Sequence, residues 1–263
     1  MNVFTVRIFF FLDGHHKLVR WRFITHGAID GYSRLVLFIS CSNNNSSRTV
    51  YDLFLKASIQ YGLPSRIRCD QGLENILVAQ HMLHYRGAER RSVLVGSSVH
   101  NQRVERLWRD SHRCVTSTFY NLFYYLEANS LLNPIEELHL LALHYVFIPR
   151  INRALTQFRN AWNNHGIRTE RSQTPNQLFT AGVLRLQGRA AFDFFENVPE
   201  DYGTEESGIA STEDGVTIPQ IHTELSENQK TLLKESIDPL ESSDDYGVSL
   251  YLRTLQLLMT FNL

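Results

Sequence analysis

Two strand-like runs in this sequence are each followed by an aspartate, and this pairing most constrains the fold. Asp13 follows the apolar residues 8–12, and Asp70 follows the alternating residues 65–69 and precedes a Gln-Gly turn signal. Runs of this length and composition favour buried strands. Because strands are rigid, aspartates at strand ends are typical of carboxylates held at fixed positions.

A third acid, Glu105, stands in the first turns of a predicted helix. Ser97 or Ser98 is a candidate N-cap, and no Gly or Pro follows before Pro134. Two interpretations of Glu105 are open. It pairs with Arg109 at i+4 on a solvated face, worth about a few tenths of a kcal/mol, or it is a metal ligand on a surface that holds a polyanion. The second interpretation is favoured by the arginines around it, which are Arg103, Arg106, Arg109 and Arg113.

The side chains available for chemistry point to hard cations rather than zinc. Three carboxylates offer oxygen ligands, which suit Mg²⁺ or Mn²⁺. Two such ions about 4 Å apart activate a water or a 3′-hydroxyl and stabilise the leaving oxygen of a phosphodiester. The cysteines, Cys41, Cys69 and Cys114, are scattered and form no C-x-x-C motif, so no zinc module is predicted and a reducing compartment is favoured.

The net charge of −1 conceals a division of the chain. Residues 1–192 hold 23 Lys and Arg against 12 Asp and Glu, whereas residues 193–245 hold 2 against 15. A basic globular part beside an acidic segment is typical of nucleic-acid-binding proteins. The basic part is almost entirely arginine, the side chain suited to bidentate phosphate contact. A solvated surface beside a passive acidic tail is the alternative interpretation, and the acidic triad weighs against it.

Four segments, in order, resemble the motifs of a known family. Residues 29–34 (I-D-G-Y-S-R) are similar to D-x-x-S-R, residues 70–75 (D-Q-G-L-E-N) to D-N-G-x-E-F, and residues 98–105 to P-x-x-x-Q-x-x-x-V-E. Residues 162–167 with Thr174-Pro175 are similar to the ending Y-N-x-x-R-P-H…T-P. Thirty-four residues lie between Asp70 and Glu105, close to the spacing usual in that family. Residues 8–185 therefore resemble the catalytic core of retroviral-type integrases and DDE transposases.

Two longer segments resemble a narrower group, the eukaryotic integrase-core proteins. That group carries D-G-H-H-K-L and H-N-Q-R-x-E-R-L-W-R-D, which are matched here by residues 13–18 and 100–110.

The resemblance implies an α/β, ribonuclease-H-like fold. It comprises a mixed sheet flanked by helices, with additional C-terminal helices and an acidic tail.

The local sequence patterns predict the individual elements. They predict an antiparallel meander of strands at 3–13, 18–24 and 28–40, a strand at 65–69 parallel to the first, and a short strand at 92–95. They predict helices at 49–61, 74–85, from 98 onward, and at 135–163, and a short helix after Thr174. Residues 1–185 form the predicted core with its helical extension, 186–245 an acidic, mostly flexible segment that carries a predicted helix at 226–237, and 246–263 a short apolar element.

The resemblance also implies the site. Asp13, Asp70 and Glu105 would be catalytic and would bind two Mg²⁺ or Mn²⁺ ions. The predicted DNA contacts are Lys17, Arg103, Arg106, Arg109 and Arg113. Glu74 is expected to be structural or DNA-facing. Asp30 is expected in a turn rather than as a fourth ligand, and Trp108 in the core rather than as a base-stacking platform.

The predicted function is that of a DNA integrase or transposase core, which cleaves a phosphodiester and joins a 3′-hydroxyl to target DNA. The alternative is a domesticated, non-catalytic nucleic-acid-binding or protein-interaction protein on the same fold. It is favoured by a chain that begins twelve residues before Asp13 and by Phe10, Phe11 and Leu12 where the family has a tryptophan. A nuclease that cuts without joining is a third hypothesis.

The expected partners are DNA, further copies of this chain in a homo-oligomer, and a protein that binds the acidic segment. No membrane partner is expected, and a nuclear location is inferred from the substrate.

DNA binding by this basic surface should depend steeply on salt. Five phosphate contacts would release about five counterions, so affinity for a DNA duplex should fall roughly 500-fold between about 50 and about 200 mM salt. Fluorescence anisotropy over a salt series measures the slope. Arg106→Gln should reduce the slope by about one unit, and an affinity that hardly changes with salt would contradict a phosphate-binding surface.

Overall fold

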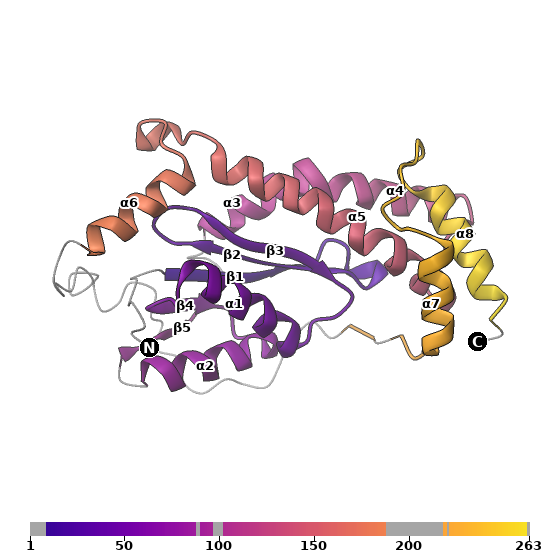
Figure 1. The fold of residues 1–263 in the computed structure, drawn as a ribbon, viewed down its shortest axis with the longest axis horizontal. Helices are drawn as coiled ribbons and strands as arrows, with labels where there is room; N and C mark the ends of the chain where they lie inside the picture. Colours follow the sequence, from indigo (N-terminus) through magenta and orange to yellow (C-terminus); the bar gives the residue numbers. More distant parts are fainter. Residues whose placement is uncertain (1–8, 88–89, 97–101, 188–217, 220, 262–263) are drawn as a thin grey trace.

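The computed structural model describes residues 9–87, 90–96, 102–187, 218–219 and 221–261. Its centre is a five-stranded mixed sheet in the order β3-β2-β1-β4-β5 (Figure 1). The first three strands form the expected antiparallel meander, and β4 and β5 add to β1 in parallel. The strands are β1 Phe9–His15, β2 Ile24–Asp30, β3 Val36–Ser42, β4 Arg66–Cys69 and β5 Val93–Val95.

Two of the predicted strand boundaries were wrong. Most of the strand expected at 18–24 is a 3-10 turn, η1, at Val19–Trp21, which buries Trp21, and β2 begins only at Ile24. The run 28–40 is two strands separated by a turn at residues 31–34. The carboxylate of Asp30 makes this turn by accepting hydrogen bonds from the backbone N–H and hydroxyl of Ser33, at 2.8 and 2.6 Å. The turn at Asp30 was expected, but its place between two strands was not, because buried apolar residues lie on both sides of it.

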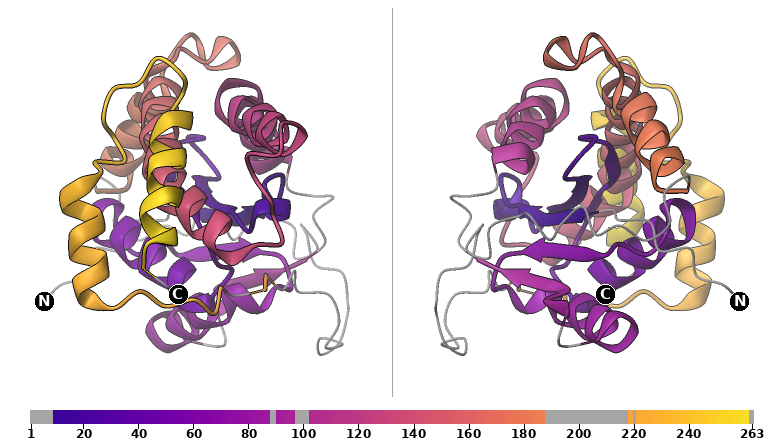
Figure 2. Two further views of the ribbon diagram at one scale, coloured as in Figure 1. Left: turned by 90° about the vertical axis from the view of Figure 1, so that its right-hand side faces the viewer. Right: turned by 90° about the vertical axis from the view of Figure 1, so that its left-hand side faces the viewer.

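Helices cover both faces of the sheet. Helices α1 (Ser47–Tyr61) and α2 (Ile76–Arg86) pack on one face, around Phe10, Phe54 and Ile67. The opposite face carries α3 (Gln102–Ser111), α4 (Ser117–Ala128) and α5 (Glu137–Asn164), as the end views show (Figure 2). A π-helical turn at His112–Thr116 joins α3 to α4, and α6 (Pro175–Gln187) follows α5. None of the helices in the described ranges is long and apolar enough to cross a membrane.

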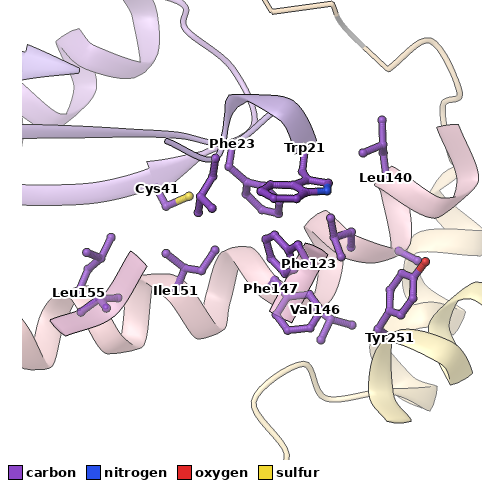
Figure 3. Packing of buried hydrophobic residues seen from close by; sticks show 14 of the residues in the cluster. Trp21, Phe23, Cys41, Phe123, Leu140, Val146, Phe147, Ile151, Leu155 and Tyr251 are labelled. Carbon is purple, nitrogen blue, oxygen red and sulfur yellow. The ribbon is translucent and has the colours of Figure 1, made fainter. Parts of the chain in front are cut away.

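Aromatic residues of α4 and α5 form the larger core with the sheet. Phe123 is fully buried, 5.2 Å from the ring of Trp21 and 5.0 Å from that of Phe147 (Figure 3). Tyr251 enters the same core from α8. Of the aromatic segment 119–126, Phe123 and Leu126 are buried in this core, whereas Tyr124 and Tyr125 are exposed.

The C-terminal residues pack against α5. Helix α7 (Glu227–Ser236) begins with a capping box at Ser226, and α8 (Val248–Met259) lies beside α5. Arg150 donates to the carbonyl of Glu241 at 2.5 Å. Of the segment 186–245 that was expected to be mostly flexible, residues 188–217 and 220 lie outside the described chain. Residues 221–245 instead pack against the core, because apolar side chains of this segment contact the buried cluster. These side chains are Ile221, Leu225, Leu233 and Ile237.

Two asparagines of α5 complete the free edge of β3. Asn163 accepts from the N–H of Val36 at 2.8 Å and donates to its carbonyl at 3.0 Å. Asn152 does the same for Cys41, at 2.8 and 2.9 Å. An edge strand normally leaves such groups unpaired, so the two side-chain amides replace a neighbouring strand.

Removing either amide should destabilise the fold. In Asn163→Leu the buried N–H and C=O of Val36 lose this partner, and the free energy of unfolding should fall by about 2–4 kcal/mol. Asn164→Leu is the control, because Asn164 is exposed on the same helix and bonds to Asn160 and Asn176 rather than to the edge of β3. Urea unfolding gives both values, and an equal, small loss in the two variants would contradict the edge-completion role.

Candidate active site

Parallel pairing brings Asp13 and Asp70 to the same edge of the sheet. Phe11 of β1 lies opposite Arg68 of β4. Asp13 comes two residues later and is still within β1, which continues to His15, so the strand end expected at Asp13 was wrong, and Asp70 directly follows the end of β4. Burial, and then the negative charges of Asp70 and Glu74, raise the pKa of Asp13 to about 6. Within the described residues, no Lys or Arg forms an ion pair with either aspartate. The pair is therefore a buried concentration of negative charge without a protein counter-ion.

Hydrogen bonds hold both carboxylates in place. The indole N–H of Trp108 donates to Asp13 Oδ2 at 2.8 Å, and the N–H of Gly14 donates to Oδ1 at 2.8 Å. Asn75 donates from Nδ2 to Asp70 Oδ1 at 2.8 Å. Trp108 is buried, as predicted, but its bond to Asp13 also makes it part of the site, a role that sequence reasoning missed.

Glu74 lies near the two aspartates, as the sequence predicted for this fold. Its carboxyl folds over Gly72, and burial followed by the charge of Asp70 raises its pKa. It also accepts from Asn45 Nδ2 at 3.4 Å. The signal was present in the sequence, because Glu74 follows Asp70 by four residues in a predicted turn, so both belong to one loop.

Glu105 is exposed in the first turn of α3 and is not assembled with the two aspartates. In the described part of the chain, no three His, Cys, Asp or Glu side chains are grouped closely enough to hold a metal ion. Glu105 precedes Trp108 by three residues, which is about 4.5 Å along a helix axis, and Trp108 reaches Asp13. The candidate cap residues Ser97 and Ser98 lie outside the described residues.

Histidines border the aspartate pair. His15 stacks on Trp108 with ring centroids 5.1 Å apart and planes 15° apart. Burial, and then the nearby His112, lower the pKa of His15 to about 4. His16 Nε2 and His112 Nδ1 are buried and have no hydrogen-bond partner among the described residues. A neutral imidazole at such positions has the capacity to accept or donate a hydrogen bond.

The predicted DNA contacts have the exposure that such a role requires. Lys17 is exposed beside the histidines, and Arg109 is exposed on α3. Arg106 and Arg113 flank Asp110, each 3.8 Å from it, and their side chains are 72% and 79% exposed. The side chain of Arg103 lies outside the described part. DNA binding by these residues stays a prediction.

A mixed five-stranded sheet flanked by helices, with Asp13 on β1 and Asp70 directly after the neighbouring β4, matches a ribonuclease-H-like integrase core fold. The chain matches the family described as "Integrase core domain" over residues 1–192, which is more than two thirds of its length. It belongs to the integrase core domain family.

The chain is also similar, at low sequence identity, to solved integrase structures. The HTLV-2 integrase catalytic core domain in complex with magnesium, in its trimeric form, has a TM-score of 0.44 and 16% sequence identity, over 68% of this chain and 99% of that chain. Its dimeric form has a TM-score of 0.43 and 15% identity, with the same coverage. The simian T-cell lymphotropic virus intasome, in complex with the PP2A regulatory subunit B56 gamma, has a TM-score of 0.40 and 16% identity, over 68% of this chain and 57% of that chain. No curated protein matches the chain.

The repulsion between the aspartates should appear in the pH dependence of stability. The pKa of Asp13 is raised from 3.8 to about 6 in the fold. The protonated form is thus favoured in the folded state, and its stabilisation is present below about pH 4 and lost as pH rises through about 6. A shift of this size corresponds to a loss on the order of 3 kcal/mol.

Asp70→Asn should make that loss smaller, because it removes one like charge and retains the oxygen that accepts from Asn75. Thermal unfolding from pH 4 to 8 in metal-free buffer measures the slope. Asp52→Asn, an exposed charge on α1, is the matched control. If Asp70→Asn leaves the slope unchanged, the two carboxylates do not interact as described.

Proposed function

We propose that the chain is the core of a DNA integrase or transposase that cleaves and joins DNA phosphodiesters with the help of divalent metal ions. The observation that supports the proposal is that Asp13 on β1 and Asp70 directly after the neighbouring β4 lie close enough to interact, in a member of the integrase core domain family. Water would first free a 3′-hydroxyl, which would then attack target DNA in line, without a covalent protein intermediate.

The donor set fits hard divalent cations. Asp13 and Asp70 are oxygen donors whose charges are not compensated by any cationic side chain in the described ranges, and a bound cation would remove the repulsion that raises the pKa of Asp13. Asp13, Asp70 and Glu105 would hold Mg²⁺ or Mn²⁺. The ions would supply the activation of the attacking oxygen and the stabilisation of the leaving oxygen.

The chain's own residues would carry the remaining work. Asn75 and Trp108 orient the two aspartates through the hydrogen bonds described above. Lys17 and the exposed arginines of α3 would bind phosphates without reading sequence. Glu105 would complete the ligand set from α3, which Trp108 holds against β1. Self-association and a protein partner for the acidic segment stay predictions.

A second function is favoured by one observation. Glu105 is exposed and belongs to no three-ligand group among the described residues. A domesticated DNA-binding protein on the same fold would keep the basic surface and the fold and would need no complete metal site. The two functions differ in metal binding and in joined products.

Metal titration and strand transfer separate these functions. Isothermal titration of the full chain with Mn²⁺ should show saturable binding that is lost in the double variant Asp13→Asn, Asp70→Asn. Strand transfer from a labelled duplex should fall at least 100-fold in Glu105→Gln, because a ligand of the reacting metals is lost. The control is Glu170→Gln, an exposed acid that pairs with Arg34.

The outcomes of the two experiments distinguish the proposed functions. Metal binding that is absent, or identical in wild type and the double variant, contradicts the catalytic proposal and favours the domesticated protein. Cut products without joined products identify a nuclease. Loss of salt-dependent DNA binding together with loss of metal binding contradicts both nucleic-acid functions.

A further inference from the structure

We propose that Trp108 is a positioning residue, which fixes the orientation of the Asp13 carboxylate for a divalent cation. The inference rests on the proposed function. It starts from the contact itself, in which the indole N–H donates to Asp13 Oδ2 at 2.8 Å. Indole N–H is a donor only, so it orients the carboxylate without competing as a metal ligand. Since Gly14 donates to Oδ1, each oxygen is held by one donor and retains further acceptor capacity.

The space for the indole is provided by a glycine opposite Asp13. Gly27 of β2 pairs with Asp13 of β1. A Cβ atom built on Gly27 would lie 2.6 Å from Cη2 and 3.2 Å from Cζ2 of Trp108, and contacts under 3.0 Å force a shift. The ring therefore lies directly over the backbone of β2, where any larger residue would displace it from Asp13.

The opposite side of the ring is also occupied. His15 stacks on Trp108 with nearly parallel planes, and Trp108 is only 7% exposed. A ring packed between a strand backbone and an imidazole has one orientation available. Its N–H is thus aimed at Asp13 by packing, which is the way that supporting residues fix metal ligands in other proteins.

The same contact also places α3. Trp108 follows Glu105 by three residues on this helix, a little less than one turn, with Trp108 buried and Glu105 exposed. The hydrogen bond to Asp13 therefore fixes how far Glu105 is from the aspartate pair. Trp108 would act on two of the three proposed ligands without touching the metal itself.

The chain contains a matched control. Its three tryptophans all donate an indole N–H, Trp21 to Glu127 and Trp162 to the carbonyl of Arg34 at 2.9 Å. Trp162 is on α5, in contact with the backbone next to β3 and not with the aspartates. Trp162→Phe therefore removes the same kind of bond outside the site.

The test uses the full chain labelled with ¹⁵N at its indoles. Three indole cross-peaks are assigned with single Trp→Phe variants. In metal-free protein, Asp13→Asn should shift the Trp108 cross-peak and leave that of Trp162 in place. Mg²⁺ should move the Trp108 cross-peak in wild type, and the apparent Kd for Mg²⁺ should rise about 10-fold or more in Trp108→Phe. In strand transfer, kcat should fall while KM for DNA stays unchanged.

Gly27→Ala provides an independent route, because it keeps the indole N–H and displaces the ring. It should weaken Mg²⁺ binding as Trp108→Phe does, even if one of the two variants folds poorly. Trp162→Phe should leave the Kd for Mg²⁺ at the wild-type value.

The outcomes are distinct. Wild-type Mg²⁺ affinity in both site variants, or an equal loss in Trp162→Phe, overturns the positioning role and leaves the proposed function intact. An absence of any Mg²⁺ response in wild type overturns the proposed function and this inference with it.

Discussion

The fold depends on the way in which α5 completes the sheet. The β3 strand is an edge, and its outward backbone groups at Val36 and Cys41 bond to the amides of Asn163 and Asn152. The asparagines are eleven residues apart, about three helical turns, so they anchor α5 along the strand at two points. The same helix packs against α8, and Tyr251 of α8 lies within 6.5 Å of Phe147 between their ring centroids. Because α5 has partners on both sides, the sheet and the C-terminal helices form a continuous body.

That rigidity allows the site to hold an unfavourable arrangement. Burial raises the cost of the Asp13 charge, and repulsion by the nearby Asp70 adds to it. Asp13 lies within β1 at the centre of the sheet, and Asp70 directly follows β4 and accepts a hydrogen bond from Asn75. Packing in the two cores therefore supplies the free energy that keeps the negative charges together. A divalent cation bound there, as proposed above, would offset this electrostatic cost.

The parts of the fold that follow from local patterns were predictable. The helix at α1, the parallel return of β4 and the cap of α7 at Ser226 all follow from short-range periodicity and capping chemistry. The turn at Asp30 was also identified, but its effect on the strand boundary was not, since apolar residues continue on both sides of it. Contacts between distant residues left no local signal. Nothing near Trp108 indicates that its indole reaches Asp13, because the contact depends on the absence of a side chain at Gly27, 81 residues away in the sequence.

The packing of the C-terminal residues also bears on the acidic segment. Residues 193–217 contain eight acids and no Lys or Arg. The segment that precedes these acids in the structure is α6. The segment that follows them is held to α5, because Glu137 accepts hydrogen bonds from the N–H groups of His222 and Thr223. Helices α6 and α7 lie at opposite ends of the molecule (Figure 1). These eight acids are therefore joined at both ends to segments fixed on a core of net positive charge. If the arginines of α3 bind a polyanion as proposed above, the acids would compete with it at a higher effective concentration than a tail joined at one end would have.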